Sequence, residues 1–277
     1  MLPNLIIIGA QKCGTTSLHY YLSLHPQIRM SREKELNFFI KERNWHKGIE
    51  WYKSNFTTKA KIYGESSPNY TNYPFFMGVP ERMCSVVPEA KLIYIVRDPI
   101  DRITSHYVYN YANSHENRTI AEALAYFDNN PYVYRSKYCM HLEQYLKYFE
   151  NTRILIITQE DLYTQRRKTL QEIFRFLDID DSFYIQKFSN IRFNSSDLRR
   201  KNRIGLLLTR MPGMKIIERD PPGVRWHIER FLYFPFSQKI EKPTLDENLK
   251  QELIDYLRDD INRLRQFTDY NFENLCV

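Results

Sequence analysis

The sequence contains few cysteines and no recognisable targeting segment. Its four cysteines, in a chain of 277 residues, form neither a CxxC pair nor a regular spacing. This pattern argues against a zinc site or a disulfide framework and favours a reducing compartment. The apolar run Leu5–Ile8 has no basic segment before it and no cleavage site after it, and no apolar stretch approaches membrane length. We therefore predict a soluble, cytoplasmic protein without a transmembrane segment.

The chain also lacks internal repeats, low-complexity segments and a strong charge of either sign. It has 40 lysines and arginines against 33 aspartates and glutamates, a formal net charge of +7. This mild excess suits an anionic ligand or an ordinary solvated surface, but it is too small for a nucleic-acid-binding protein. The length and an apolar content of 43% allow one large core, so we predict a single domain over residues 1–277.

Three continuous apolar runs predict buried parallel strands. They cover Leu5–Ile8, Lys91–Val96 and Arg153–Thr158, and helical signals follow each of them, the last extending to about Leu177. Alternating strands and helices are typical of an α/β fold, here a P-loop-like central parallel sheet flanked by helices. Ligands of such folds bind beyond the carboxyl ends of the strands.

The C-terminal part of the chain is predicted to end in an amphipathic helix. Thr244 and Glu247 match a capping box. An apolar stripe at helical spacing follows, formed by Leu249, Leu253, Tyr256, Leu257, Ile261 and Leu264. We expect this helix to pack on the sheet. The part from about residue 195 is basic and rich in proline and turn signals, so we expect it to be less regular and to cover the ligand.

The loop Gly9–Thr16 carries the strongest chemical signal. A strand that stops at glycine and continues as a helix presents backbone N–H groups at the positive end of a helix dipole, where phosphate binds. The spacing of Gly9 and Gly14 matches the GxxxxGK frame of nucleotide triphosphatases, but Thr15 stands where that motif requires lysine. The second predicted strand ends in Arg97 instead of an acidic Mg²⁺ ligand. These features argue against a kinase and favour a ligand with two separate phosphates and no metal.

Several motifs, in chain order, resemble sulfotransferases that use 3′-phosphoadenosine 5′-phosphosulfate (PAPS), and are most similar to the heparan sulfate (N-/3-O-) type. Gly9–Leu18 is similar to the 5′-phosphosulfate loop of that family, and Arg97–Tyr107 to its 3′-phosphate-binding element. The other similar motifs are Lys34–Phe39, Gly48–Tyr52, Gly64–Tyr70, Arg135–Tyr138 and the basic stretch Arg199–Arg203. The resemblance implies metal-free, in-line transfer of the sulfuryl group of PAPS to a hydroxyl or amine.

The resemblance also implies roles for individual residues. Lys12 would stabilise the charge that grows on the leaving adenosine bisphosphate. Glu35 would take the proton of the acceptor, and Lys34 would keep Glu35 ionised or contact the sulfuryl group. The residues expected to bind PAPS are Gln11, Lys12, Cys13, Gly14, Thr15, Thr16, Ser17, Arg97, Ser105, Tyr138, Arg199, Arg200 and Lys201. Helix capping, core packing or solvation are the structural alternatives for the same side chains.

Three further alternatives stay open from the sequence. His19 or His106 could act as the base, because histidine does so in some sulfotransferases. Ser66 stands where the heparan sulfate type commonly has lysine, which allows a different acceptor or a noncatalytic protein that binds PAPS or its product adenosine 3′,5′-bisphosphate (PAP). A kinase with a degenerate phosphate loop is the third alternative. The acceptor classes considered are glycans, glycolipids, small alcohols and peptide tyrosine.

Overall fold

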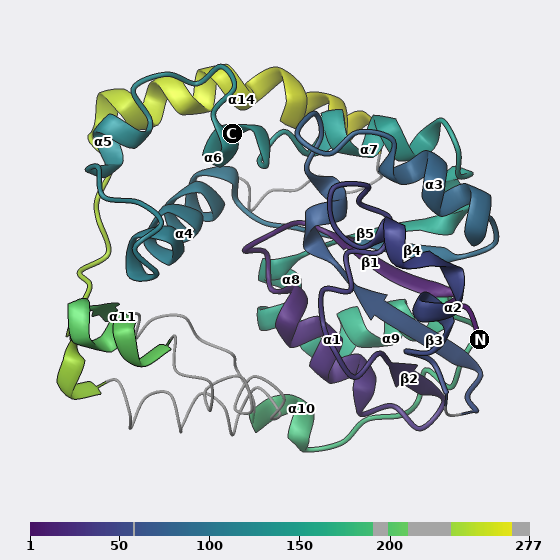
Figure 1. Cartoon of the computed structure of the whole chain (residues 1–277). Helices are drawn as coiled ribbons and strands as arrows, with labels where there is room; N and C mark the ends of the chain where they lie inside the picture. The colour runs from purple at the N-terminus through teal and green to yellow at the C-terminus, as the bar shows by residue number, and fades with distance from the viewer. Residues whose placement is uncertain (58, 191–198, 210–233, 268–277) are drawn as a thin grey trace.

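A parallel sheet with helices on both faces forms the centre of the molecule (Figure 1). The computed structural model describes residues 1–57, 59–190, 199–209 and 234–267. The strand order is β2-β3-β1-β4-β5, with all neighbours parallel. The strands are β1 Leu5–Gly9, β2 Ile28–Met30, β3 Ile62–Ser66, β4 Lys91–Val96 and β5 Ile154–Thr158. The predicted fold class is confirmed.

The middle of the sheet is β1, whose five residues are all buried. Leu5 pairs with Gly64 of β3 on one side and with Lys91 of β4 on the other. A strand covered on both faces needs apolar side chains throughout, which explains the continuous run in the sequence. The carboxyl ends of the strands meet at one edge of the sheet, where the loop after β1 begins.

Helices α1, α8 and α9 lie on one side of the sheet, and α3 and α7 lie on the other, with α14 outside α7 (Figure 1). The helices are α1 Thr15–Ser23, α2 Gly48–Lys53, α3 Val79–Val86, α4 Pro99–Ala112, α5 Ile120–Ala123, α6 Pro131–Tyr134, α7 Tyr138–Leu146, α8 Gln159–Thr164, α9 Arg166–Phe176, α10 Lys187–Asn190, α11 Arg203–Thr209 and α14 Glu247–Phe267. Short 3₁₀ turns are η1 Trp45–Lys47, η2 Pro68–Thr71, η3 Asn151–Arg153 and η4 Phe234–Phe236. An antiparallel pair joins β6 Arg199–Lys201 to β7 Ser237–Lys239. No helix of the described ranges is long and apolar enough to cross a bilayer.

The predictions for the last helix need two corrections. The cap of α14 is Asp246 rather than Thr244, because the Asp246 carboxylate accepts from the backbone N–H groups of Asn248 and Leu249 at 2.9 and 3.4 Å. The helix also packs on α4 and α7 instead of on the strands. That face of the sheet is already covered by α7, whose Tyr138 meets Tyr94 of β4.

The contact between α14 and α7 has a polar centre at Asp260. This buried carboxylate accepts from the backbone N–H groups of Cys139 and Met140 at 2.9 and 2.8 Å. A side chain from one helix therefore caps the first turn of another. The helix predicted after β5 is also divided, since Gln165 separates α8 from α9.

Candidate active site

The loop between β1 and α1 leaves the start of α1 open to a ligand. Gly14 is the N-cap residue and has a φ of 92°, a left-handed conformation that favours glycine. No side chain caps the first turn of α1, so its backbone N–H groups are available for an anion. At Gly9 a Cβ atom would lie 1.9 Å from Thr71 Oγ1, which explains why this strand must end in glycine.

Lys12 projects from this loop toward α4. Its Nζ lies 4.3 Å from the centre of the Tyr109 ring. Burial lowers the pKa of Lys12 to about 8, and the positive charges of Arg97, Lys34 and Arg102 contribute in the same direction. A negatively charged ligand would relieve this crowding of positive charge.

Arg97 follows β4 and reaches forward along α4. Its Nη2 donates to Asp101 Oδ2 at 2.9 Å, and Ser105 lies one further turn along the helix. The Tyr138 hydroxyl donates to the Arg97 carbonyl at 2.8 Å and fixes the backbone there. The buried Nε of Arg97 has no hydrogen-bond partner among the described residues. Arg97 therefore reaches along α4 toward the turn that carries Ser105, and the binding of one ligand group by both stays a prediction.

Two more arginines, Arg102 and Arg135, add positive charge behind this site. Arg102 is fully buried, donates to Ser136 Oγ at 2.6 Å and to the Tyr132 carbonyl, and leaves Nη1 without a partner in the described part of the chain. Arg135 donates to Asn69 Oδ1 at 3.2 Å. Burial lowers the pKa of Arg135 to about 9, with a further contribution from Arg102. Buried cations without carboxylate partners are costly, so a bound anion would stabilise them.

Glu35, the predicted general base, and its neighbour Lys34 lie at the edge of this cationic region. Lys34 Nζ and Glu35 Oε1 are 2.8 Å apart, and their side chains are 19% and 44% exposed. The backbone of Glu35 has a φ of 66° and donates its N–H to the Ser66 carbonyl at 2.9 Å. A partly exposed carboxylate at this position can accept a proton from an incoming group.

Polar groups of β3 hold this segment in place. The Glu65 carboxylate is buried and accepts from the hydroxyls of Tyr52, Tyr70 and Ser67 at 2.6, 2.8 and 2.9 Å. Ser67 Oγ in turn accepts from the backbone N–H of Asn37 at 3.0 Å. The acidic side chain inside the sheet thus supports the loop that carries Glu35.

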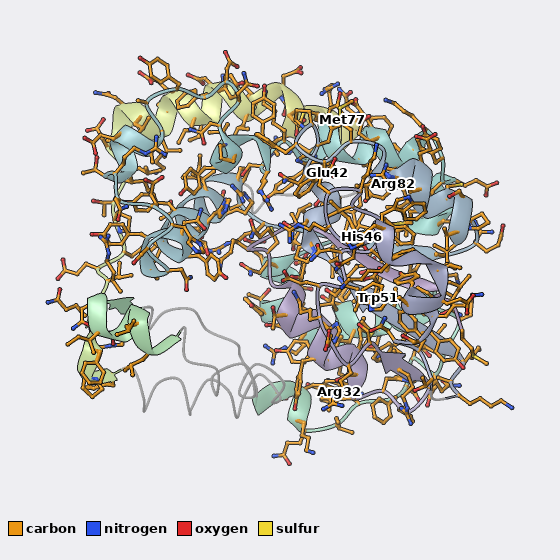
Figure 2. All side chains as sticks on the ribbon, viewed as in Figure 1. Arg32, Glu42, His46, Trp51, Met77 and Arg82 are labelled. Atoms are coloured by element: carbon orange, nitrogen blue, oxygen red, sulfur yellow. The ribbon has the colours of Figure 1, made fainter. Side chains whose placement is uncertain are left out.

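The other end of the Glu35 segment is fastened to α3. Arg82, labelled in Figure 2, donates from Nε to the Phe39 carbonyl at 2.8 Å. Phe38 and Phe39 are buried in the main core, so the segment turns inward after the charged residues.

The remaining residues of this loop and of the first turn of α1 are buried or half-buried. Cys13, Thr15 and Ser17 are buried, while Gln11 and Thr16 are half-buried. The Cys13 thiol lies 3.7 Å from the Tyr138 hydroxyl, and burial raises the pKa of Cys13 to about 11. The roles predicted for these residues in binding PAPS stay predictions, and the full burial of Tyr138 places it behind the loop.

The structure brings only part of the basic C-terminal stretch to α4. Arg200 stacks over Tyr111 at 4.0 Å and donates to Asn117 Oδ1 at 2.6 Å. Arg199 instead donates to Ser237 and is therefore engaged with β7. The side chain of Lys201 and much of the stretch after residue 195 lie outside the described residues, so their predicted covering role stays a prediction.

Arg102 was not among the predicted site residues. It stands on the apolar face of α4 between Ile100 and Ile103, and an arginine in such a position could have been recognised as a buried functional cation. The described residues contain no cluster of three His, Cys, Asp or Glu side chains that could hold a metal ion.

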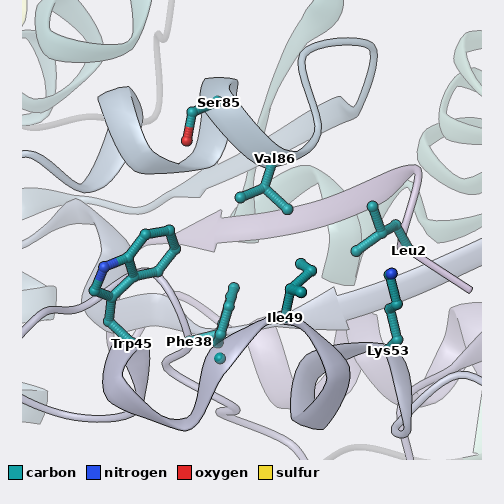
Figure 3. A pocket seen from close by; sticks show the side chains of 8 residues that line it. Leu2, Phe38, Trp45, Ile49, Lys53, Ser85 and Val86 are labelled. Atoms are coloured by element: carbon teal, nitrogen blue, oxygen red, sulfur yellow. The ribbon is translucent and has the colours of Figure 1, made fainter.

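The residues present fit a ligand with two separate anionic groups. The uncapped start of α1 offers one anion-binding position, and the unpaired N–H groups of Arg97 and Arg102 offer another. A separate cavity of about 540 Å³, shown in Figure 3, is lined by apolar side chains such as Phe38 and Trp45. It contains none of the predicted site residues, so we do not place the chemistry there.

Comparisons with known proteins show the family of this chain. A family model described as a sulfotransferase domain matches residues 2–203. Heparan sulfate glucosamine 3-O-sulfotransferase 5 of Mus musculus is 32% identical over 258 residues, which cover 88% of this chain and 72% of that protein. Bifunctional heparan sulfate N-deacetylase/N-sulfotransferase 2 of Homo sapiens is 30% identical over 198 residues, 64% of this chain. The match spans 22% of that bifunctional protein's length.

The fold has a similar solved counterpart. The structure of a sulfotransferase from Alicyclobacillus acidocaldarius superposes with a TM-score of 0.61 and 24% sequence identity, covering 81% of this chain and 99% of that one. This likeness supports the arrangement of sheet and helices. The family model and the 3-O-sulfotransferase relative identify the chain as a member of the sulfotransferase family, as its motifs predicted.

Proposed function

We propose that this protein transfers the sulfuryl group of PAPS to a hydroxyl group of a glycan. The observation that carries the proposal is the convergence of positive charge around Lys12 beside the partly exposed Lys34–Glu35 pair. The cations suit the anionic donor, and the carboxylate suits an acceptor that must lose a proton. These are the two requirements of sulfuryl transfer to a hydroxyl.

The donor side of the reaction depends on charge placed before the substrate arrives. When bound, PAPS supplies an activated sulfuryl group and two phosphates. Lys12 neutralises the oxygen on which negative charge grows as the sulfuryl group departs, and it does so more strongly in the transition state than in the ground state. Arg97 and Ser105 hold the 3′-phosphate, while the start of α1 holds the 5′-phosphate.

On the acceptor side, Glu35 removes the proton of the attacking hydroxyl. Lys34 holds the carboxylate in place through their 2.8 Å ion pair, and the hydrogen bond to the Ser66 carbonyl fixes the backbone of Glu35. The partial exposure of Glu35 leaves room for an acceptor to approach from solvent.

The names of the relatives support a glycan as the acceptor class. The 3-O-sulfotransferase matches over most of its own length, whereas the bifunctional N-sulfotransferase matches over about a fifth. We therefore propose a sugar hydroxyl in preference to an amine. The cytoplasmic location favoured by the cysteine pattern, and the single-domain organisation, remain predictions.

Transfer of ³⁵S from labelled PAPS to a panel of glycans, glycolipids and small alcohols tests the proposal. We expect transfer to at least one glycan. The substitution Lys12→Ala should lower kcat by about 10² or more, and Glu35→Gln by about 10² to 10⁴. Glu50→Gln is a matched control, because the Glu50 side chain is 81% exposed and pairs only with Lys53 in the described ion pairs.

Two results would contradict the proposal. Binding of PAP without transfer to any acceptor class would favour a noncatalytic protein. Tight binding of ATP with Mg²⁺ and no binding of PAP would favour a kinase.

A further inference from the structure

His106 follows Ser105 on α4 and lies beside the cationic region of the active site. Its side chain is 5% exposed. Burial lowers the pKa of His106 far below its usual range, and the positive charges of Arg102, Arg135 and Lys12 lower it further. The imidazole is therefore neutral at physiological pH, and one of its two ring nitrogens carries the single proton.

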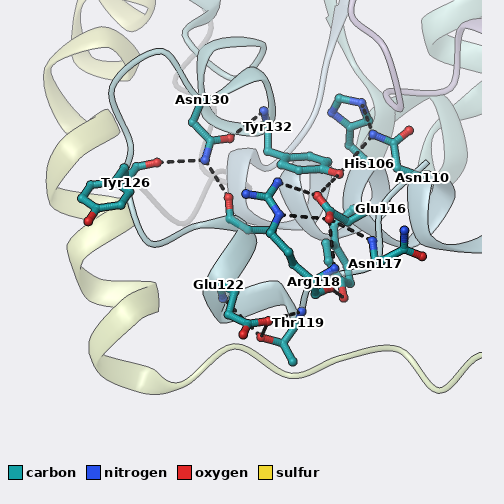
Figure 4. A network of polar contacts seen from close by, with 12 residues as sticks. His106, Asn110, Glu116, Asn117, Arg118, Thr119, Glu122, Tyr126, Asn130 and Tyr132 are labelled. Carbon is teal, nitrogen blue, oxygen red and sulfur yellow. Dashed lines mark hydrogen bonds and ion pairs between the residues drawn. The ribbon is translucent and has the colours of Figure 1, made fainter. Parts of the chain in front are cut away.

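A chain of hydrogen bonds that begins at Glu116 determines which ring nitrogen of His106 carries the proton (Figure 4). The Glu116 carboxylate accepts from Arg118 Nε and Nη2 at 3.0 and 2.7 Å. These hydrogen bonds are the main reason why the pKa of Glu116 falls to about 2, so the carboxylate is ionised and can only accept. The Tyr132 hydroxyl, 3.2 Å from Oε2, must therefore donate its proton to Glu116.

The hydrogen bond from Tyr132 to Glu116 fixes the orientation of the Asn110 amide. The Tyr132 oxygen has given its proton to Glu116, so it accepts from Asn110 Nδ2 at 3.1 Å. The same NH₂ group of Asn110 lies 3.5 Å from His106 Nε2 (Figure 4). An amide NH₂ cannot accept a hydrogen bond, so Nε2 carries the lone pair and the proton is on Nδ1.

The Nδ1–H group of His106 is buried and has no partner among the residues that the structure describes. Its charged neighbours Lys12, Arg102 and Arg135 are all cations and cannot accept a hydrogen bond from it. An unsatisfied buried donor is costly, so the position calls for an oxygen atom brought by a ligand. Lys12, one of these neighbours, is the residue that we place at the bridging oxygen of PAPS, the sulfuryl donor.

We propose that His106 donates its Nδ1–H to an oxygen of the sulfuryl group of bound PAPS, and that it does not act as the general base. This inference rests on the proposed function. His106 would then be a second hydrogen-bond donor at the sulfuryl group, in addition to Lys12. The relay of Glu116, Tyr132 and Asn110 acts as a positioning device that keeps the correct nitrogen protonated.

PAPS and PAP differ only by the sulfuryl group, so calorimetry with both nucleotides tests the proposal. In His106→Leu we expect the affinity for PAPS to fall by about tenfold or more, because a charge-assisted hydrogen bond is lost, while the affinity for PAP stays within about twofold. In His106→Asn the amide nitrogen can occupy the place of Nδ1, so PAPS affinity should stay within about threefold of the wild type. The PAP affinity also reports whether each variant is folded.

The relay is tested separately through Asn110→Asp. A carboxylate next to Nε2 can only accept, so it moves the proton from Nδ1 to Nε2. We expect ¹⁵N NMR of His106 to show the Nδ1–H form in the wild type and the Nε2–H form in the variant. PAPS affinity should fall as in His106→Leu. Asn113→Asp, three residues further along, controls for the added negative charge.

Two outcomes would overturn the inference. One is an equal loss of PAPS and PAP affinity in His106→Leu. The other is a kcat/KM profile that loses its acidic limb in His106→Asn, because that limb would then belong to His106 acting as a base. A wild-type protein that binds neither nucleotide would instead contradict the proposed function itself.

Discussion

The close approach of Gly9 to Thr71 gives a prediction that can be worked out from the structure. Substituting Gly9→Ala would place a Cβ atom 1.9 Å from Thr71 Oγ1 and 3.0 Å from its Cβ and Cγ2. Thr71 is buried in η2 and cannot move away freely. The strand and the 3₁₀ turn would be forced apart at the start of the PAPS loop.

Overpacking of a tight site typically costs 1–3 kcal/mol, and the overlap here places Gly9→Ala near about 3 kcal/mol. Thr71→Ala alone removes one methyl group and a 3.4 Å hydrogen bond to the Pro68 carbonyl, so we expect a loss of about 1 kcal/mol. The double variant lacks the overlap with Oγ1 and retains only the 3.0 Å approach of the two Cβ atoms. It should lose about 2 kcal/mol in total, which implies a coupling of about 2 kcal/mol.

Urea unfolding of the wild type, both single variants and the double variant measures this coupling. Calorimetry with PAP on the same four proteins should show the weakest binding for Gly9→Ala and recovery in the double variant. Additive losses, with a coupling below about 0.5 kcal/mol, would refute the steric explanation.

Three more predictions concern single groups. Lys12 loses its proton as the pH rises through about 8, so kcat/KM should fall above this pH, and Lys12→Arg should move the fall to higher pH; an unchanged alkaline limb would contradict the role of Lys12. Tyr70→Phe removes one of the two hydroxyls that donate to Glu65 Oε1 and should lower the free energy of unfolding by about 1–3 kcal/mol, measured in urea. Asp260→Ala uncaps α7 and should cost about 1–2 kcal/mol, whereas Asp259→Ala, at a side chain that is 90% exposed, should change stability by less than about 0.5 kcal/mol; equal effects of the two would show that the cap is unimportant.

The central strands were predictable because a buried strand appears in the sequence as a continuous apolar run. A strand covered on both faces is continuously apolar, and β1, β4 and β5 fit this rule. The strand β3 does not, since it contains Gly64, Glu65 and Ser66. Its glutamate is tolerated because the hydroxyls of Tyr52, from α2, and Tyr70, from η2, satisfy the carboxylate. The hydrogen-bond partners of Glu65 are brought together by the tertiary fold, so no local sequence pattern predicts them.

The same distinction applies to the active site. The loop around Lys12 and the start of α4 at Arg97 are local features, and sequence spacing was enough to predict them. The contributions of Arg102 and Arg135 arise where α4 packs against the segment around α6. The tautomer of His106 depends on residues as far away as Glu116 and Tyr132. These properties follow from packing and could not be obtained from spacing.

The central claim is that the cations around Lys12 and Arg97 form a site for a nucleotide with a 3′-phosphate. Calorimetry of the wild type and Arg97→Ala with PAP and with adenosine 5′-phosphate tests it most directly. We predict that the wild type binds PAP about 10- to 100-fold more tightly than adenosine 5′-phosphate, and that Arg97→Ala removes most of this difference. Equal affinity of the wild type for the two nucleotides would contradict the account.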